Sequence, residues 1–504
     1  MNKSVKNIFW GVFGQVITMI IGLILPRLRI VSFGSEVNGL LSSVQQIYVY
    51  FALLEAGVGA TSLQSLYGPV ARDDKDSING VLAATHSYYR RTGIVYLIAV
   101  FAFAAIYPFT LNSDIDKLTI VGVILLNGLG NVLAYFFQGK YKILLQAEGK
   151  KYILTNLTTA VTTLSGIAKV ALIFLLPNVI ALQAVYFLFS LLQVLYFWWY
   201  IRRHYKWIDL KVAPNTEALK QKKSALVHQI SQLIFNNTDV LLLTYFCGLK
   251  FVSIYALYNM VFDMVSTLIS NINEGFAFKL GQLFNSDRKQ FDKAYNVYER
   301  FYISVSFALY SVCFLLIPSF IALYTKGVTD ADYMMPFLPL LFTVVKILVS
   351  GRAPSGFVSS YAGHFKLTEN RAIIEAAINI VVSVVCVNFF GIYGVLMGTI
   401  AALLYRANDM IIYANGRILN RSNWDTYKWW ILNIGLLVAF VILFNIVSPS
   451  IESYGIFFVV AVAVTSVICP INLITTYLCS NKEVKDFLKS LLPAFLRKHK
   501  QQEE

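Results

Sequence analysis

The sequence predicts an all-α polytopic membrane protein, and three observations carry this prediction. Of the 504 residues, 57% are hydrophobic and only 14% are charged, whereas about a quarter of a soluble protein is charged. The mean hydropathy is +0.63. Apolar runs of roughly 17 to 25 residues, the length that crosses a bilayer as a helix, recur along almost the whole chain. In this setting the net charge of +15 indicates membrane topology and not a nucleic-acid partner.

We expect fourteen transmembrane helices, because short polar or glycine-bearing segments separate fourteen such runs. An even number of spans places both chain ends on one side of the membrane. The expected spans are 8–25, 40–66, 92–111, 118–138, 152–176, 179–201, 225–246, 251–273, 301–324, 333–350, 372–390, 391–412, 430–447 and 455–478.

The basic residues predict which side the chain ends occupy. With the N-terminus in the cytoplasm, nearly all of the 42 lysines and arginines fall in cytoplasmic segments. Two fall within spans, and the few on the outer side are Arg27, Arg29, Lys117, Lys250 and Lys326. The positive-inside rule therefore predicts a multi-pass protein of the cytoplasmic membrane with both termini in the cytoplasm.

The two halves of the chain repeat at an offset of about 214 to 218 residues. A glycine turn that leads into a helix begins at Phe33 and again at Cys247, and the polar step at Gln146 resembles the one at His364. Such internal repeats are typical of transporters, whose substrate site lies at the repeat interface. We expect an N-terminal six-helix bundle (1–207), a cytoplasmic linker (208–224), a second six-helix bundle (225–416), two further spans (417–480) and a basic amphipathic tail on the cytoplasmic leaflet (481–504).

Several features argue against covalent chemistry. The predicted outer loops are too short for an extracytoplasmic domain, and no nucleotide-binding P-loop is present. The five cysteines stand singly, without metal or redox spacing. We therefore expect neither an enzyme, such as a polysaccharide polymerase or a glycosyltransferase, nor a metal site.

Four stretches allow a comparison with a known family. They read N-I-F-W-G-V-F-G-Q at Asn7–Gln15, R-I-V-S-F-G-S-E-V-N-G-L at Arg29–Leu40, N-N-T-D-V-L-L-L-T-Y-F-C-G at Asn236–Gly248 and G-I-Y-G-V-L-M-G-T at Gly391–Thr399. With its spans arranged as six, six and two, the chain resembles the polysaccharide transporter family, the O-antigen and capsular polysaccharide flippases. That family is a branch of the multidrug/oligosaccharidyl-lipid/polysaccharide exporter superfamily.

The resemblance implies a flippase with a MATE-like fold. Such a protein moves an undecaprenyl-type, polyprenyl-diphosphate-linked oligosaccharide to the outer leaflet by alternating access, for surface polysaccharide biosynthesis. It implies membrane lipids as surroundings, a polymerase and glycosyltransferases as partners, and no cofactor besides a coupling proton or Na⁺. The alternative is a cation-coupled multidrug extruder of the same fold, whose cavity would be rich in acids. Here the basic candidates match or outnumber the acidic ones.

A diphosphate needs a wet, cationic groove, because a buried unpaired charge costs several kcal/mol or more. Arg27 is the first candidate and Arg29 the second, since an arginine fork suits diphosphate and both lie on the outer side beside Pro26. Two residues apart on a helix, they point to roughly opposite faces. The alternative role is an interfacial anchor.

Further cations are candidates on weaker grounds. Lys169 and Lys346 lie within spans, where cations mark a substrate pathway or an ion pair. Arg90, Arg91 and Arg352 lie near cytoplasmic span ends, where they could capture diphosphate or only reflect the positive-inside bias.

Three acids within the spans are candidates for a coupling-ion site or for charge balance. These are Glu55, Asp239 and Asp263. Each could bind a proton or cation during transport, or could neutralise a cation in the cavity. The sequence leaves both roles open.

Overall fold

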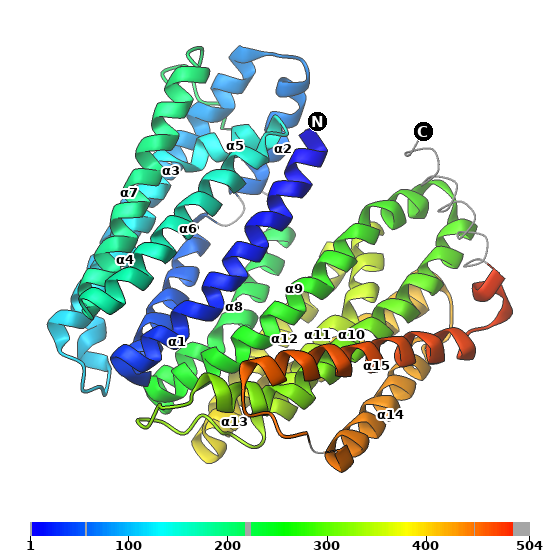
Figure 1. Ribbon diagram of the computed structural model, residues 1–504. Coiled ribbons are helices and arrows are strands. Elements are labelled where there is room, and N and C mark those ends of the chain that lie inside the picture. The colour runs from blue at the N-terminus through cyan, green and yellow to red at the C-terminus, as the bar shows by residue number, and fades with distance from the viewer. Residues whose placement is uncertain (1–2, 56–57, 217–222, 448, 487–504) are drawn as a thin grey trace, which may run out of the picture. The chain divides into compact units, whose positions relative to one another are not determined.

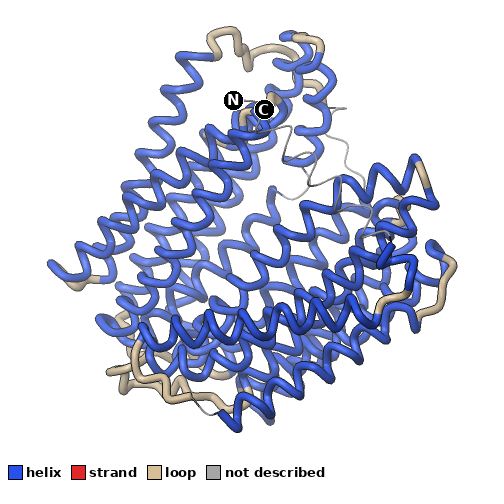
Figure 2. The backbone as a smooth tube through the Cα atoms, turned by 45° about the vertical axis from the view of Figure 1, so that its right-hand side comes forward, coloured by secondary structure: helices blue, strands red, loops and turns tan. Residues whose placement is uncertain are grey.

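The computed structural model describes residues 3–55, 58–216, 223–447 and 449–486. This part of the chain is helical throughout, with no strand (Figure 2). Twelve of its helices are long and apolar enough to cross a membrane. The predicted all-α membrane fold is therefore confirmed, while the number fourteen stays a prediction.

The helices follow one another with short connections (Figure 1). They are α1 (Lys3–Phe51), α2 (Val58–Ala71), α3 (Lys75–Thr110), α4 (Lys117–Phe137), α5 (Gly139–Ala147), α6 (Lys151–Leu175), α7 (Val179–His204), α8 (Lys223–Phe246), α9 (Leu249–Ser286), α10 (Arg288–Tyr324), α11 (Leu338–Tyr361), α12 (Phe365–Phe390), α13 (Ile392–Tyr413), α14 (Trp424–Val447) and α15 (Tyr454–Cys479). A 3₁₀ turn, Ala52–Glu55, follows α1, and a π-helical turn, Ala414–Leu419, follows α13.

Helix α1 contains the first predicted span (8–25) and the start of the second (40–66), and its break lies at Gly34. The sequence analysis ended the first span before Pro26, but the helix continues through this proline. Gly34 has φ 83° and ψ 168°, a conformation that only glycine adopts readily. The next residue is held in place by the loop after α10, because the Ser35 backbone N–H donates to Asp330 Oδ2 (2.7 Å) and its hydroxyl donates to Oδ1 (2.8 Å).

Three helices are much longer than a bilayer is thick. Helices α3, α9 and α10 have 36, 38 and 37 residues, so each is roughly 55 Å long at 1.5 Å per residue. They extend well beyond the predicted spans 92–111, 251–273 and 301–324. N-caps explain two of the early starts, since Asp74 accepts from the Ser77 N–H and Asp287 from the Gln290 N–H.

The first compact unit comprises residues 1–257 with the loop segment 327–331. Its core is formed by fully buried aliphatic side chains of α1, α3, α4 and α5, among them Leu40, Val44, Val100, Val123 and Leu144. Helix α6 lies alongside the first half of α1 (Figure 1). These helices surround the cavity described below.

Helix α8 also belongs to the first unit, where it is hydrogen-bonded to the second half of α1. Tyr50 and Thr238 share a bond of 2.9 Å between hydroxyls, and Ser43 and Thr244 share one of 2.8 Å. The sequence analysis assigned α8 to the second repeat bundle. The predicted bundles, 1–207 and 225–416 on either side of the 208–224 linker, stay a prediction.

The second compact unit comprises residues 258–326 and 332–504. Within it, α12 and α13 form a tight hairpin that turns at Gly391, which has φ 54°. A Cβ at Gly398 would lie 2.1 Å from Ser383 Oγ, so only glycine allows this approach. Most of the predicted tail, 481–504, lies outside the described residues; its described start is helical at residues 482–486.

Candidate functional site: a cationic cavity in the first unit

A cavity of about 580 Å³ opens among six helices of the first unit. Its walls come from α1, α3, α4, α5, α6 and α7. The lining residues are Leu25, Arg29, Leu41, Gln45, Tyr48, Val49, Ala52, Tyr89, Tyr96, Asn127, Asn131, Ala134, Tyr135, Gly139, Lys142, Lys169, Leu182, Gln183 and Tyr186.

The charged side chains that line this cavity are all basic. They are Arg29 on α1, Lys142 on α5 and Lys169 on α6, and no Asp or Glu is among the described lining residues. The Arg29 charge lies near enough to repel that of Lys169. The ammonium of Lys169 lies 5.1 Å from the centre of the Tyr186 ring, a cation–π contact that holds it at the wall. The cavity thus offers an anion several cationic contacts within a membrane helix bundle.

Five tyrosines form much of the remaining wall, and none of them was predicted from the sequence. They are Tyr48, Tyr89, Tyr96, Tyr135 and Tyr186. The rings of Tyr96 and Tyr135 lie 4.9 Å apart, and those of Tyr48 and Tyr96 stack at 6.3 Å. Close packing fixes one ring from behind: a Cβ at Gly128 would lie 2.5 Å from the Tyr48 hydroxyl, so glycine is needed there.

Four amides complete the polar wall. Asn127 Nδ2 donates to Gln183 Oε1 (2.7 Å), and the Tyr186 hydroxyl donates to Asn131 Oδ1 (3.2 Å). The sequence contains one signal that could have identified two of these amides. Asn127 and Asn131 stand four residues apart in an otherwise apolar helix, a spacing that puts both on one face.

The structure places Arg29, and not Arg27, in the cavity wall. Arg29 Nε donates to the Leu25 carbonyl at 3.4 Å. Arg27 is half-buried on the same helix and is not among the lining residues. The two arginines therefore separate by helical face, as their spacing predicts, but the order of preference given by the sequence analysis does not match this cavity.

Lys346 and Arg352 of α11 are both in ion pairs within the second unit. Lys346 Nζ lies 2.6 Å from Asp263 Oδ1 and 3.2 Å from Asn259 Oδ1. Arg352 pairs with Glu375. The same carboxylate also accepts from Arg406, whose Nε lies 3.3 Å from Glu375 Oε2. The contact of Lys346 matches the ion-pair alternative given for it, whereas the pair of Arg352 with Glu375 was not predicted.

The other predicted residues lie apart from the cavity lining. Arg90 and Arg91 are exposed on α3. Asp239 is buried in the first unit and accepts from the Tyr255 hydroxyl at 2.9 Å. Asp263 pairs with Lys346, as described. The side chain of Glu55 lies outside the described residues.

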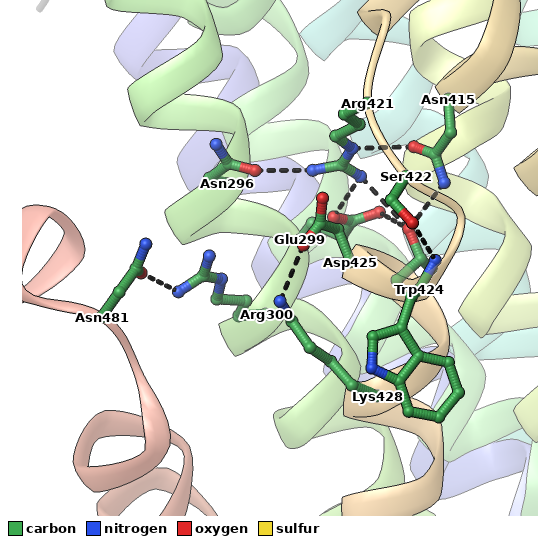
Figure 3. A network of polar contacts seen from close by, with 11 residues as sticks. Asn296, Glu299, Arg300, Asn415, Arg421, Ser422, Trp424, Asp425, Lys428 and Asn481 are labelled. Carbon is green, nitrogen blue, oxygen red and sulfur yellow. Dashed lines mark hydrogen bonds and ion pairs between the residues drawn. The ribbon is translucent and has the colours of Figure 1, made fainter.

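The second unit holds a buried ionic network that the sequence analysis did not foresee. Figure 3 shows Arg421, in the segment before α14, pointing toward Glu299 of α10. Arg421 Nη2 lies 2.5 Å from Glu299 Oε2, and Thr426 donates to the other carboxylate oxygen at 2.9 Å. Arg421 Nε also donates to Asn415 at 2.8 Å. In the sequence, Arg421 is one loop arginine among many, and nothing in the pattern marks its partner. Within the second unit, the network joins α10, the segment that leads into α14 and the π-helical turn.

Among the described residues, no group of three histidine, cysteine or acidic side chains could hold a metal ion. The cavity wall presents cations, amides and aromatic rings. Such groups can bind and orient an anionic, hydroxyl-rich ligand.

A family model described as "Polysaccharide biosynthesis protein" matches residues 4–278, more than half of the chain. None of the curated proteins matches the chain.

Solved membrane transporters share its fold. A structure titled "Lipid II flippase MurJ, inward closed conformation" is 13% identical, with a TM-score of 0.66, and the alignment covers 93% of this chain and 99% of that one. An inward-facing multidrug resistance MATE family transporter of the MOP superfamily is 13% identical, with a TM-score of 0.60 and coverage of 81% and 98%. An outward-facing MATE family transporter of the same superfamily is 14% identical, with a TM-score of 0.51 and coverage of 83% and 96%. These similarities confirm the predicted MATE-like flippase fold.

Proposed function

Because this chain belongs to the polysaccharide biosynthesis protein family, we propose that it is a flippase for polyprenyl-diphosphate-linked oligosaccharides. It would carry the repeat units of a surface polysaccharide from the inner to the outer leaflet of the cytoplasmic membrane. Alternating access would expose the bound head group first to one side and then to the other. Binding and movement complete this function, so no covalent step is needed.

The cavity of the first unit is the observation that supports this proposal. A diphosphate carries at least two negative charges and cannot enter hydrocarbon without cationic partners. Arg29, Lys142 and Lys169 supply such partners, and the described lining adds no carboxylate to repel the ligand. Arg29 would grip the phosphate oxygens through its planar fork, and the lysines would add point charges.

The tyrosines and amides support the oligosaccharide part of the proposed ligand. Sugars present apolar C–H faces and many hydroxyls, so aromatic rings and amide groups suit them together. Tyr48, Tyr96 and Tyr135 offer ring faces, and Asn127 and Gln183 offer donors and acceptors. The alternative, a drug extruder, would need acidic side chains in the cavity wall to bind cationic substrates. The two acidic candidates whose side chains are described, Asp239 and Asp263, are bonded to Tyr255 and Lys346 instead.

Separate substitution of Arg29 and of Arg27 tests the proposal. Arg29→Ala should reduce surface polysaccharide and in vitro flipping roughly 10- to 100-fold, because hydrogen bonds to charged groups contribute about 1.5–3 kcal/mol. Arg29→Lys should restore part of the activity. Arg27→Ala is the matched control and should stay close to wild type. Protein level is measured by immunoblot alongside. Full export by Arg29→Ala at a normal protein level would contradict the assignment, and loss with Arg27→Ala alone would return the role to Arg27.

The rest of the proposal concerns orientation, drive and partners. We propose that both termini are cytoplasmic, on the charge distribution given above. Export would be coupled to a proton or Na⁺ gradient, or drawn forward as a polymerase consumes the delivered units that glycosyltransferases supply. The acids Asp239 and Asp263 are proposed to balance charge, since each already contacts a protein partner.

A further inference from the structure

An apolar groove lies on the outer face of the first unit, next to the cationic cavity. It has a volume of about 480 Å³ and is lined only by residues 17–25 of α1 and 163–171 of α6. Its rims are wide open, since Ile20, Ile24 and Ile167 are 52%, 46% and 61% exposed. In a membrane protein, such a face meets the hydrocarbon of the bilayer.

A glycine, Gly166, shapes the floor of the groove. A Cβ at Gly166 would lie 3.0 Å from Ile21, so glycine brings α6 close to α1 and leaves a hollow above the contact. The one polar residue in the lining, Thr163, donates its hydroxyl to the Thr159 carbonyl at 2.7 Å. Its hydroxyl is therefore engaged within α6, and the isoleucines, Leu25, Val170 and Ala171 leave a surface that suits a branched aliphatic chain.

The groove and the cavity adjoin each other along α1 and α6. Leu25 lines both. On α6, Lys169 lines the cavity while its neighbours Gly166 and Val170 line the groove. On α1, Arg29 stands one turn beyond Leu25 and bonds to its carbonyl. A ligand that places an anionic head on Arg29 and Lys169 would therefore have an apolar path leading away from that head toward the lipid.

We propose that this α1–α6 groove holds the head-proximal part of the polyprenyl chain while the diphosphate occupies the cavity. The inference rests on the proposed function and adds the place where the lipid tail leaves the protein. Bulk lipid is equally apolar, so the groove gains little from the hydrophobic effect and acts mainly through van der Waals fit. It fixes the direction in which the bound lipid lies.

A substitution that fills the groove distinguishes binding of the polyprenyl chain from binding of the diphosphate head group. The full-length protein in nanodiscs is titrated with a C55 polyprenyl diphosphate and, separately, with a water-soluble sugar diphosphate that has no chain. Ala171→Phe, at an exposed groove position, should weaken binding of the C55 lipid about tenfold, or about 1.4 kcal/mol. It should leave binding of the chainless sugar diphosphate unchanged. Ala184→Phe is the matched control, because this alanine is also exposed, lies on α7 and lines neither site. The affinity for both ligands should stay at the wild-type value.

The outcomes distinguish the two proposals. Arg29→Ala should weaken both ligands. If Ala171→Phe binds the C55 lipid as wild type does, the groove assignment is wrong and the proposed function is unaffected. If wild type binds neither diphosphate, the proposed function is wrong. A diazirine in the first isoprene units gives a second readout that needs no variant. Label should appear in residues 17–25 or 163–171, and label confined to helices other than α1 and α6 would overturn the inference.

Discussion

At the level of single residues, the most unusual charge is Lys140 at the start of α5. This lysine is 6% exposed, and its ammonium lies 3.1 Å from His86 Nδ1 and 3.4 Å from the Phe136 carbonyl. Burial lowers the pKa of Lys140 to about 8, because the charged form loses its hydration. The neighbouring charge of Arg90 also acts on His86, so this corner gathers positive charge beside Gly139 of the cavity wall.

The lowered pKa of Lys140 predicts a rise of stability with pH. An unfolded lysine holds its proton until about pH 10.5, so between pH 8 and 10.5 the unfolded chain binds more protons and folding gains up to about 3 kcal/mol. The Tm of wild type, measured in detergent, should increase over this range relative to Lys140→Met. The exposed lysine variant Lys151→Met is the control and should follow wild type. Parallel curves for wild type and Lys140→Met would show that the ammonium is not desolvated.

The sequence predicted features of single residues that depend on helical spacing. It did not predict which residues, distant along the chain, come together in the cavity. Opposite faces for Arg27 and Arg29 follow from helix geometry alone. Which face meets a cavity depends on the neighbours α3, α4 and α7, and no local pattern around Arg29 states this. The five tyrosines of the cavity wall were not predicted for the same reason. Aromatic residues are 15% of the chain, and nothing in the sequence distinguishes these five tyrosines from aromatic residues that only pack in the core.

At the level of elements, the break in α1 shows why glycine and not proline interrupts the helix. Pro26 removes one hydrogen-bond donor but accepts helical φ, and the helix continues past it. Gly34 has a positive φ, and Asp330 fixes the residue that follows. The sequence analysis recognised the glycine turn near Phe33 and correctly placed a change of direction there. The end it predicted at Leu25 was wrong.

Replacing the glycine at this break should destabilise the protein. Gly34→Ala places a side chain at φ 83°, ψ 168°, which costs about 1–3 kcal/mol, and its Cβ would lie 3.1 Å from Asp330 Oδ2. The matched control is Gly435→Ala within α14, where an added Cβ meets nothing within 4 Å and helix propensity improves. Thermal unfolding in detergent should show a lower Tm for the first variant and an equal or higher Tm for the second. Equal losses would contradict a conformational role for Gly34.

At the level of the whole molecule, composition and charge predicted the class of fold, since hydropathy and the positive-inside rule act on long segments and average over local error. The long helices α3 and α10 start earlier than predicted because their polar N-terminal ends are capped by Asp74 and Asp287, which a hydropathy window does not register. The buried pair of Arg421 and Glu299, separated by more than a hundred residues, depends entirely on tertiary packing.

Transport as a whole should reveal whether the acids couple to an ion. In proteoliposomes with imposed proton, Na⁺ or voltage gradients, Asp263→Asn should keep the wild-type response to each gradient. It should lower stability by up to about 1 kcal/mol, because Lys346 loses its ion pair and keeps only its contact with Asn259. The double variant with Lys346→Gln should recover that loss. A gradient response abolished in Asp263→Asn at unchanged Tm would instead identify this acid as the coupling site.

The cavity and the groove are both built entirely from the first unit, within residues 17–186. Under the proposed function, every group assigned to binding the lipid therefore belongs to one of the two compact units. Substitutions in α1 and α3 to α7 should then change the dissociation constant of the lipid directly, because these helices contribute nearly all of the described side chains that line the cavity and the groove.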